Sequence, residues 1–457
     1  MDETYIKKVD VNAPGEILCK WHHKRDVFHR IQPPWESANI INKAASISDG
    51  LEEHIQIQMG PLKKMWIARY QDVIEGKQFC DLQVKGPFGY WLHKHIFHDN
   101  GDGTSTLEDN ITYRPPLGFF GKILAGGMIR GKLDMMFDYR HEVTREDIVR
   151  HHKKDVDSRN ILISGGTGLV GKNLASLLTS IGHNVSILSR SPSKPNHVKW
   201  DLEDRYIEKE KLVDIDTVIN LAGASIAGLW TKKHKERIYR SRVAGTQFLV
   251  DALLVHAPKL KTFLSASGSG CYPLDSGETY DESGPIGESF LGKVANDWEK
   301  ASDKLLEEGI RVAKFRIGVV ISQQGGALQK MLTPAKLCLT GPWGNGKQHM
   351  SWISLADLTD ILTFAVSDEK YSGVINTVAP ESIEVNNFFK TVGKVLGRPQ
   401  PFRVPAFIMK SLPNDMGKEI FLGDNRVKPK FLEEIGYEYR HADLETSLRF
   451  ELGRLNN

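Results

Sequence analysis

The spacing of apolar and polar residues changes character about one third of the way along the chain. Before about residue 155, four segments alternate apolar and polar side chains: HIQIQMG, KMWIARYQDVI, QFCDLQVKG and STLEDNITYR. A period of two residues with one polar face is typical of antiparallel strands that cover a core on one side. The pattern therefore predicts an antiparallel sheet, with a turn at residues 101–103 (GDG) between two of its strands.

A helix is predicted after these strands, at about residues 117–138, and the charged run at residues 145–160 is predicted to be a linker. A sheet followed by a long helix is an α+β arrangement. The longest apolar-looking stretch, PPLGFFGKILAGGMIRGK, is interrupted by Lys122 and Arg130 and is shorter than the ~20 residues of a membrane-spanning helix. No membrane span is therefore expected.

From residue 160 onward, short apolar runs alternate with helix-length segments. The runs are NILISGG, NVSILSR, DTVINLAG, KTFLSAS and RVAKFRIGVVIS, and helices are predicted at about residues 231–255 and 291–308. Strand–helix–strand alternation with apolar strands predicts a parallel sheet with right-handed crossovers, which is a doubly wound α/β fold. From about residue 325 to the end, Pro, Gly and short helices dominate and the alternation is lost.

Composition and charge narrow the classes of function. The 457 residues carry 60 Lys and Arg against 57 Asp and Glu, a net charge of +3 that is too balanced for a dedicated nucleic-acid or membrane-surface protein. The four cysteines form no C-x-x-C pair, so neither a zinc site nor a disulfide framework is predicted from them. The adjacent histidines of WHHKRD and RHHKK lack the spacing of ligands on a helix, and no metal site is predicted. A reducing compartment fits best, and the cytoplasm is the expected location.

A glycine-rich turn opens the second part of the chain. Gly165, Gly168 and Gly171 have G-x-x-G-x-x-G spacing between a predicted strand and a predicted helix. In this setting the glycines permit a tight turn, close approach of backbone to a pyrophosphate, and packing of the helix on the strand. The N-terminus of the helix adds free N–H groups and a partial positive charge. The residues expected to bind a dinucleotide here are Gly165, Thr167, Gly168, Leu169 and Val170.

The end of the next predicted strand bears on which dinucleotide is bound. NAD is usually held by an acidic residue ~20 residues after the glycines. Here the strand ends in LSRSPSK, with Ser189, Arg190 and no acid. A cation beside hydroxyl groups suits a 2′-phosphate, so NADP is favoured over NAD, with Arg190 in contact with it. The alternative is a solvated basic loop in which Arg190 and Lys194 contact nothing.

Seven segments of the second part resemble the extended short-chain dehydrogenase/reductase superfamily of the sugar-nucleotide epimerase type, and more narrowly its atypical epimerase family proteins. They are ILISGGTGLVGKNL, VINLAGASI, RIYRSRVAGTQFLVDAL, FLSASGSGCY, FRIGVVISQQGGAL, GPWGNGKQHMSWISLADL and GDNRVKPKFLEEIGY. The resemblance implies an NAD(P)-binding Rossmann domain at residues 158–400 and a family-specific C-terminal domain at 401–457 on the substrate side. Residues 1–155 resemble a START-like (SRPBCC) helix-grip domain through their strand pattern, IQPPWE and the late helix.

The resemblance implies further cofactor contacts. Asp201 and Leu202 occupy the position of an acidic–leucine pair around the adenine, with a turn or helix cap as the alternative role of Asp201. Ala222 and Gly223 end a strand where small residues let the dinucleotide lie against backbone, or else form a tight turn. Arg242 lies on a helix dense in basic residues, of which most are expected to be solvated and one or two to reach phosphate.

The proton-transfer pair of the superfamily is missing from this sequence. In the superfamily a Tyr with a Lys four residues later performs that step, but alignment on Glu299 places Leu291 and Ala295 at the two positions. The candidate catalytic substitutes are Ser267, at the family's hydroxyl position, and Tyr272, in the loop that follows. Tyr272 has the alternative role of walling the pocket.

Three functions follow from these patterns. The first is an NADP-dependent oxidoreductase or epimerase-like enzyme that acts on a small-molecule substrate with non-standard acid–base residues. The second is a catalytically silent dinucleotide-binding sensor or scaffold. The third is a carrier whose START-like domain presents a hydrophobic ligand, such as a lipid, polyketide or isoprenoid, although a filled core is the alternative for that domain. The first is favoured by the substrate-side loop at residues 341–353, whose tryptophans line a ligand pocket or close a core. No oligomeric state is predicted.

Overall fold

The structure is a computed structural model that describes residues 2–24, 26–59, 62–116, 118–151 and 157–455. It divides into two compact units. The first unit comprises Met1–Asp157, Thr179–Gly182 and Leu452–Asn457, and the second comprises Ser158–Leu178 and His183–Glu451. Among the described residues, no helix combines the length and the apolarity that crossing a membrane requires.

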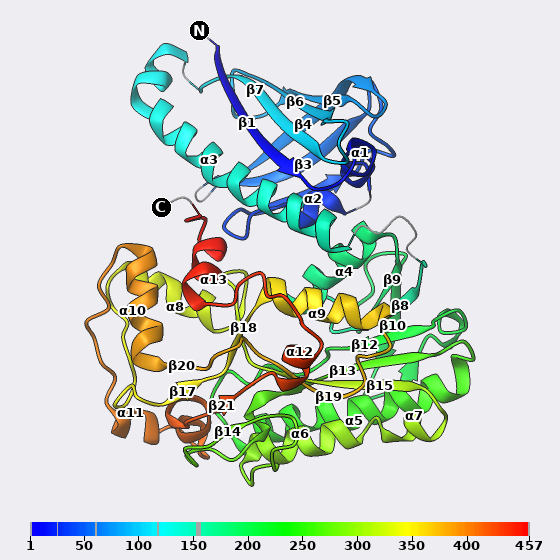
Figure 1. Ribbon diagram of the computed structural model, residues 1–457, viewed down its shortest axis with the longest axis vertical. Helices are drawn as coiled ribbons and strands as arrows, with labels where there is room; N and C mark the ends of the chain where they lie inside the picture. Colours follow the sequence, from blue (N-terminus) through cyan, green and yellow to red (C-terminus); the bar gives the residue numbers. More distant parts are fainter. Residues whose placement is uncertain (1, 25, 60–61, 117, 152–156, 456–457) are drawn as a thin grey trace. The chain divides into compact units, whose positions relative to one another are not determined.

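The first unit is built on a seven-stranded antiparallel sheet in the order β1-β7-β6-β5-β4-β3-β2, which confirms the predicted antiparallel sheet (Figure 1). The strands are β1 (Glu3–Val11), β2 (Ala38–Asn42), β3 (Glu52–Met59), β4 (Leu62–Ile74), β5 (Gln78–Lys85), β6 (Tyr90–Asp99) and β7 (Ser105–Arg114). Two short helices, α1 (Gly15–His22) and α2 (Val27–Arg30), lie between β1 and β2, and the long helix α3 (Gly118–His151) follows β7. The predicted turn at residues 101–103 joins β6 to β7.

One face of this sheet carries the core of the first unit. Two apolar clusters lie between the sheet and its helices. The first gathers α1 and residues near the ends of β1, β6 and β7, with Trp21 and Phe97 among its buried members. In the second cluster, Leu133 and Phe137 of α3 pack with Tyr5 of β1, with Trp91 at the start of β6, and with Ile111 and Tyr113 near the end of β7. Helices α1 and α3 therefore pack on the inner face of the sheet.

The predicted linker at residues 145–160 is wrong where it overlaps α3, which continues to His151. Charged side chains suit this last stretch of helix because Arg150 and Glu146 form an ion pair of 2.8 Å at i, i+4 spacing. Ile148, between them, is buried in the core. The end of the run, residues 152–156, lies outside the described residues.

The second unit contains an eight-stranded sheet in the order β11-β10-β9-β8-β12-β13-β15-β19. The strands are β8 (Asn160–Ser164), β9 (Asn184–Ser189), β10 (His197–Asp201), β11 (Tyr206–Ile207), β12 (Thr217–Asn220), β13 (Thr262–Gly268), β15 (Arg311–Ile317) and β19 (Gly373–Thr377). All neighbours pair in parallel except β10 and β11. The predicted parallel sheet is therefore confirmed, and β10, β11 and β19 are strands that the sequence pattern did not reveal.

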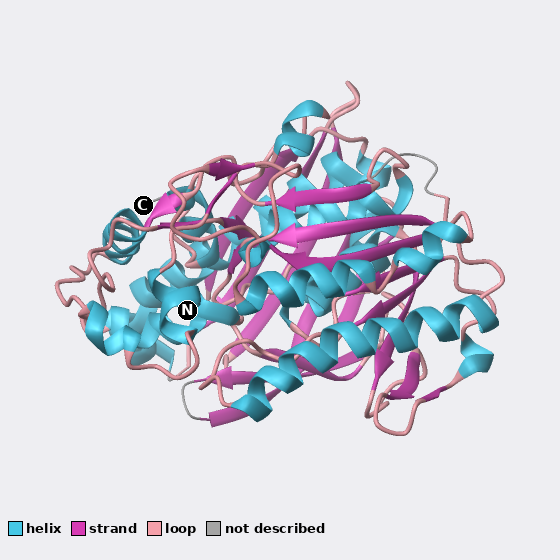
Figure 2. Ribbon diagram, turned by 90° about the horizontal axis from the view of Figure 1, so that it is seen from below, coloured by secondary structure: helices cyan, strands magenta, loops and turns pink. Residues whose placement is uncertain are grey.

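Alternate residues of these strands enter two separate cores. Ile161 and Ile163 face a cluster formed with α4 (Leu169–Ile181) and α9 (Leu355–Ser367), whereas Leu162 faces a cluster formed with α5 (Lys232–His256) and α7 (Asp303–Glu307). The strands are apolar on both faces because helices cover both faces (Figures 1 and 2). Burial on both sides fixes the register of the strands and so holds their carboxyl ends in place.

The second unit also contains further helices and short strands. The predicted helix at residues 291–308 is divided into α6 (Phe290–Lys300) and α7, while the helix predicted at 231–255 corresponds to α5. The later elements are β14 (Thr279–Tyr280), β16 (Val319–Ile321), α8 (Gly326–Lys336), β17 (His349–Met350), β18 (Trp352–Ser354), β20 (Ile383–Glu384), α10 (Val385–Leu396), α11 (Ala406–Lys410), a π-helical turn (Gly417–Leu422), β21 (Arg426–Val427), α12 (Lys430–Glu434) and α13 (Leu444–Glu451).

Candidate functional site

The strand order places a topological switch point between β8 and β12. From β8 the chain continues to β9 and β10 on one side, and then returns to β12 and β13 on the other. Loops that leave the carboxyl ends of two such strands diverge, and a crevice forms between them. In open parallel sheets this crevice is the usual place for a ligand. The glycine-rich turn after β8 and the Leu221–Gly223 segment after β12 border it.

The glycines of the turn are required by their neighbours. Gly165 has a φ of +72°. A Cβ on Gly165 would lie 2.8 Å from the carbonyl carbon of Leu221 on the neighbouring strand connection. A Cβ on Gly171 would strike the carbonyl oxygen of Gly165 and lie 2.6 Å from Cα of Gly166. The Gly168 N–H donates a 2.9 Å hydrogen bond to the Gly165 carbonyl and closes the turn. The floor of the crevice is therefore bare backbone.

The turn delivers the N-terminus of α4 to the same place. Thr167 and Gly168 are exposed at the tip of the turn, and Leu169 is the first residue of α4. Val170 is half-buried against the first of the two cores of this unit. The first N–H groups of a helix have no partner within the helix and carry its positive dipole end. An anionic group such as a diphosphate is stabilised at such a position.

The end of β9 carries no acidic residue. Arg190 follows the strand directly, and its side chain is exposed. The Ser189 hydroxyl accepts a 3.2 Å hydrogen bond from the Ser191 N–H and so holds the start of the loop. Among the described residues, no carboxylate pairs with Arg190. An exposed, unpaired cation at this place agrees with both expectations, the 2′-phosphate contact and the solvated basic loop, and the contact stays a prediction.

Asp201 and Leu202 lie at the end of β10. The Asp201 carboxylate accepts hydrogen bonds from the N–H groups of Glu203 at 2.8 Å and Asp204 at 3.3 Å, so the side chain holds a turn. Leu202 lies beside Gly245 of α5, where a Cβ would be 3.9 Å from the Leu202 methyl carbon. The turn role of Asp201 is thus present in the structure. The adenine contacts of Asp201 and Leu202 stay predictions.

Arg242 reaches the loop after β12 from α5. Its guanidinium fills the space next to Gly223, where a Cβ would lie 2.9 Å from the central guanidinium carbon. It donates a 2.9 Å hydrogen bond to the Ala224 carbonyl and lies over the Trp298 ring. Burial lowers the pKa of Arg242 to about 10. Among the described residues it has no carboxylate partner, and it is half-buried. The cofactor contacts of Ala222, Gly223 and Arg242 stay predictions.

A chain of buried hydrogen bonds that sequence reasoning missed ties the walls of the crevice together. Ser164 donates to the Asn220 amide oxygen at 2.5 Å, and the Asn220 amide donates to Thr246 at 2.8 Å. The Trp298 indole N–H also donates to Thr246, at 3.0 Å. The chain links the ends of β8 and β12 to α5 and α6. Its sequence signal is the polar residue Asn220 at the end of an apolar strand, because a buried amide needs partners.

Ser267 and Tyr272 belong to a second buried network. The Ser267 hydroxyl donates to Glu299 at 2.7 Å, and Glu299 accepts two hydrogen bonds from Arg316, at 2.8 and 2.9 Å. Arg316 also donates to the Tyr272 hydroxyl at 2.9 Å, which in turn donates to Asn376 at 2.7 Å. Both hydroxyls are therefore bonded to protein. Their catalytic role stays a prediction.

The electrostatics of this network favour a structural role. Burial raises the pKa of Tyr272 well above its usual value, although the Arg316 charge acts in the opposite direction. Tyr272 is 0% exposed and Ser267 is 5% exposed. Burial lowers the pKa of Arg316, but the hydrogen bonds and charge of Glu299 outweigh that effect and raise it overall. A general acid works best when its pKa is near the working pH, and Tyr272 is far from that condition.

The positions of the missing Tyr and Lys are filled by apolar packing. Leu291 is packed against a cluster that includes Trp230 and Met416. Ala295 is 5% exposed in a cluster with Tyr272. The N–H of Leu291, together with that of the preceding residue, donates to the carboxylate of Glu419, at 3.0 Å for each bond. The start of α6 is thus held by the C-terminal segment and presents no proton-transfer pair at these two positions.

The C-terminal segment contacts the start of α6 and the loop after β13. Besides Glu419, the amide of Asn425 donates a 3.1 Å hydrogen bond to the Ser269 carbonyl, and β21 pairs in parallel with β14. In the loop at residues 341–353, Trp343 packs edge-on against Phe389 and Phe421. Trp352 is 2% exposed. Trp352 therefore closes a core, whereas Trp343 is half-buried and its pocket role stays a prediction.

The sheet, the switch point and the glycine turn define a dinucleotide-binding α/β protein. The chain belongs to the NAD dependent epimerase/dehydratase family, whose model matches residues 161–377. A second model, a domain of unknown function (DUF1731), matches residues 404–451. The chain is 35% identical over 295 residues to the epimerase family protein YfhF of Bacillus subtilis (strain 168), which covers 63% of this chain and 96% of that protein.

Two solved structures extend the comparison. The nucleoside-diphosphate sugar epimerase from Corynebacterium glutamicum has a TM-score of 0.80 and 28% identity, covering 98% of this chain and 90% of that chain. Human epimerase family protein SDR39U1 (isoform 2), solved with NADPH, has a TM-score of 0.60 and 31% identity, covering 65% of this chain and 99% of that chain. Both support the Rossmann-like epimerase fold of the second unit.

Proposed function

We propose that this protein is an NADP(H)-binding, epimerase-like oxidoreductase of the atypical extended short-chain dehydrogenase/reductase type. The observation that carries the proposal is the floor of bare backbone at Gly165–Gly171, set at the switch point beside the N-terminus of α4. It fits a diphosphate by shape and by charge. NADPH, when bound, supplies a hydride to an electrophilic carbon of the substrate. The human relative solved with NADPH supports this cofactor.

Two cations are proposed to hold the charged parts of the cofactor. Arg242 is half-buried, unpaired with any described carboxylate, and adjacent to Ala222 and Gly223, so we assign it to a phosphate in the crevice. Arg190 is assigned to the 2′-phosphate, since β9 ends without the acid that would bind the ribose of NAD. Asp201 and Leu202 are proposed to border the adenine through backbone and methyl groups, because the carboxylate of Asp201 already holds a turn.

Replacement of Arg190 by Asp tests the cofactor. We expect Arg190→Asp to weaken NADPH binding by at least about tenfold, because a charge-assisted hydrogen bond is replaced by repulsion, and to leave NADH binding within about twofold. Isothermal titration calorimetry with both cofactors measures this. Lys261→Asp is the matched control, since this exposed cation directly precedes β13 and lies at the amino end of its strand, whereas Arg190 follows the carboxyl end of β9. An equal loss of affinity for NADPH and NADH would show that Arg190 does not bind the 2′-phosphate.

Ser267 and Tyr272 are proposed to be positioning residues that hold the end of β13, because both hydroxyls are bonded inside the Glu299–Arg316 network. With NADPH and a panel of small carbonyl compounds, the double variant Ser267→Ala, Tyr272→Phe is expected to lose no more than about tenfold in kcat. Removal of a proton-transfer residue costs about 100-fold or more. The pH profile of kcat is expected to stay unchanged. A loss in kcat above 100-fold, together with a shifted pH profile, would show that these residues take part in proton transfer.

The second candidate function is a catalytically silent sensor or scaffold that binds the same cofactor. It is favoured by the apolar packing of Leu291 and Ala295, which replaces the proton-transfer pair. A wild-type protein that binds NADPH but turns over no member of the carbonyl panel would support this alternative.

We also propose that the first unit is a START-like helix-grip domain. The supporting observations are two short helices after β1, an antiparallel sheet, and the long helix α3 after β7 that packs on the inner face of the sheet. The proposed hydrophobic ligand has weaker support, because polar side chains lie between the two apolar clusters of that face. They are Asp81, His93, His95, Asp109 and His141.

A further inference from the structure

The inner face of the first sheet carries acidic and histidine side chains between its two apolar clusters. Asp81 lies on β5, His93 and His95 on β6, Asp109 on β7, and His141 on α3. Asp81 is directly opposite His93 across β5 and β6, and Asp109 is opposite His95 across β6 and β7. His93, Asp109 and His141 are each less than 5% exposed. Asp81 and His95 are half-buried. Buried polar and charged groups need a partner of high charge or a complete hydrogen-bond network.

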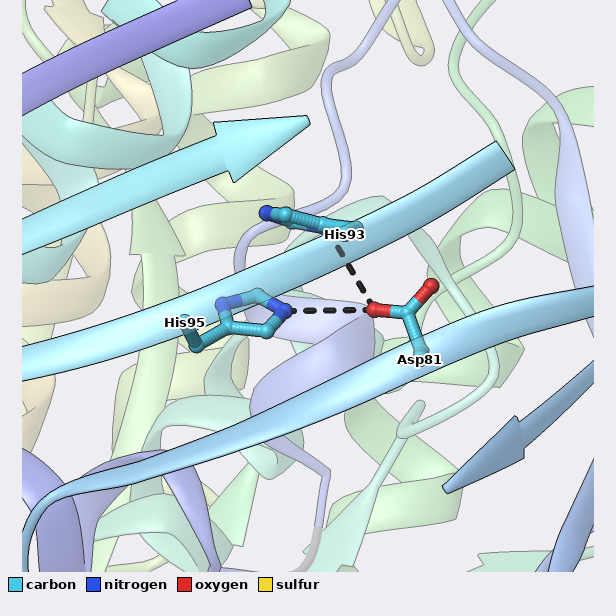
Figure 3. Close-up of side chains that lie close together, drawn as sticks. All are labelled: Asp81, His93 and His95. Atoms are coloured by element: carbon cyan, nitrogen blue, oxygen red, sulfur yellow. Dashed lines mark hydrogen bonds and ion pairs between the residues drawn. The ribbon is translucent and has the colours of Figure 1, made fainter. Parts of the chain in front are cut away.

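Three of these side chains converge on one point (Figure 3). Oδ2 of Asp81 lies 3.3 Å from Nδ1 of His93 and 3.3 Å from Nε2 of His95. One ligand atom from each residue lies within 4.8 Å of the other two. The contact with His95 also has the geometry of a hydrogen bond, but both contacts are longer than the about 2.7–2.9 Å of a charge-assisted hydrogen bond. The two distances from Asp81 to the histidine nitrogens match the ~3.3 Å edge of a tetrahedron around zinc with bonds of about 2.0–2.1 Å.

In each histidine, the ring nitrogen that does not contact Asp81 faces the carboxylate of Asp109. Oδ1 of Asp109 lies 2.7 Å from Nε2 of His93 and 3.0 Å from Nδ1 of His95. The first contact is a hydrogen bond, whereas the second has the distance of an ion pair without the angle of a hydrogen bond. Oδ2 of Asp109 accepts a 2.6 Å hydrogen bond from His141. In metal sites, histidine ligands commonly turn their second nitrogen to a carboxylate that fixes the ring.

We propose that Asp81, His93 and His95 bind a divalent transition-metal ion such as Zn²⁺, with Asp109 as the carboxylate that positions both histidines. Two nitrogens and one oxygen are a donor set for zinc or ferrous iron. The carboxylates of Asp81 and Asp109 balance the charge of a divalent ion, and the nearby guanidinium of Arg140 also interacts with the carboxylate of Glu36. Three protein ligands leave a position for water or an oxygen ligand, which is the composition of catalytic sites more than of structural ones.

Metal content of the full chain tests the site directly. Tag-free protein is stripped with a chelator, equilibrated with Zn²⁺, desalted and analysed by mass spectrometry for metal. One equivalent of zinc is expected in the wild type and a loss of at least about 100-fold in affinity in Asp81→Asn and His95→Gln. His98→Gln is the matched control, because this exposed histidine lies on the same strand but pairs with Glu108. Equal zinc content in all four proteins would overturn the proposal.

A second measurement covers variants that do not fold. Co²⁺ added to the stripped wild type is expected to give the strong visible bands of a four-coordinate site, and an anomalous difference map at the zinc edge is expected to place the ion within bonding distance of the three ligand atoms. Asp109→Asn is expected to weaken binding by about 10- to 100-fold without abolishing it. The absence of both the cobalt bands and the anomalous peak in the wild type would overturn the proposal. NADPH affinity is expected to be the same in all variants, which separates this result from the proposed function.

Discussion

Gly171→Ala is expected to weaken NADPH binding by about 100-fold. The added methyl group would strike the carbonyl oxygen of Gly165 and lie 2.6 Å from Cα of Gly166. Both neighbours are backbone, so the turn must move instead of a side chain. The turn and the N-terminus of α4 supply the N–H groups for the diphosphate, and a displacement of about 1 Å at such a site costs on the order of 100-fold. Calorimetric titration with NADPH measures the loss.

The matched control for this substitution is Gly270→Ala. There the nearest atom to the added methyl group is a Leu291 side-chain carbon at 3.6 Å, which is an ordinary contact. NADPH affinity is expected to stay within about twofold of wild type. Circular dichroism and the melting temperature verify that both variants are folded. A folded Gly171→Ala protein with wild-type affinity would show that the turn does not bind the cofactor, and the proposed function would fail with it.

The cofactor crevice could be predicted because its signals are local in sequence. Gly165, Gly168 and Gly171 lie within one strand–turn–helix unit. The apolar runs of the second part of the chain, which alternate with helix-length segments, indicated the parallel sheet. The reason that Gly165 must be glycine is not local, because the clash is with Leu221 on another strand connection. The spacing of the glycines indicates such a clash without naming the residue that causes it.

Contacts between distant segments could not be predicted in the same way. Glu299 and Arg316 lie on a helix and a strand, and Asn376 completes their network from β19, a strand whose short sequence carries no alternation. The predicted linker failed for a related reason, since Arg150 and Glu146 are partners only once the helix exists. Charge alone does not distinguish a solvated linker from the last turns of an amphipathic helix.

The histidine cluster was missed because ligands were sought at helical spacing. His93 and His95 are two residues apart on β6, and a strand directs residues i and i+2 to the same face. Asp81 is in one of the segments predicted to be strands, and Asp109 is in another. A search for i, i+2 histidines beside acidic residues on neighbouring strands would have found the signal, although the order of the strands comes only from the structure.

Glu299→Ala is expected to lower the free energy of unfolding of the second unit by about 3–5 kcal/mol. The substitution leaves the guanidinium of Arg316, which is 5% exposed, without its carboxylate. An unpaired buried charge is more costly than the lost attraction itself. Urea unfolding of the full chain, followed at the transition of the second unit, measures the change. Asp297→Ala on the same helix is the control, with an expected loss of no more than about 1 kcal/mol, because the side chain of the half-buried Asp297 accepts hydrogen bonds only from the exposed Tyr239 and from its half-buried neighbour Asn296 among the described residues.

The double variant Glu299→Leu, Arg316→Met separates the cost of an unpaired charge from the value of the pair. Both charges are then removed and replaced by apolar groups of similar volume, which in buried ion pairs is often neutral or stabilising. We expect the double variant to recover most of the stability lost in Glu299→Ala. Ser267 and Tyr272 would then lose partners within the network, so NADPH affinity should persist while the end of β13 becomes less ordered. A double variant as unstable as Glu299→Ala would show that the ion pair is itself a major source of stability.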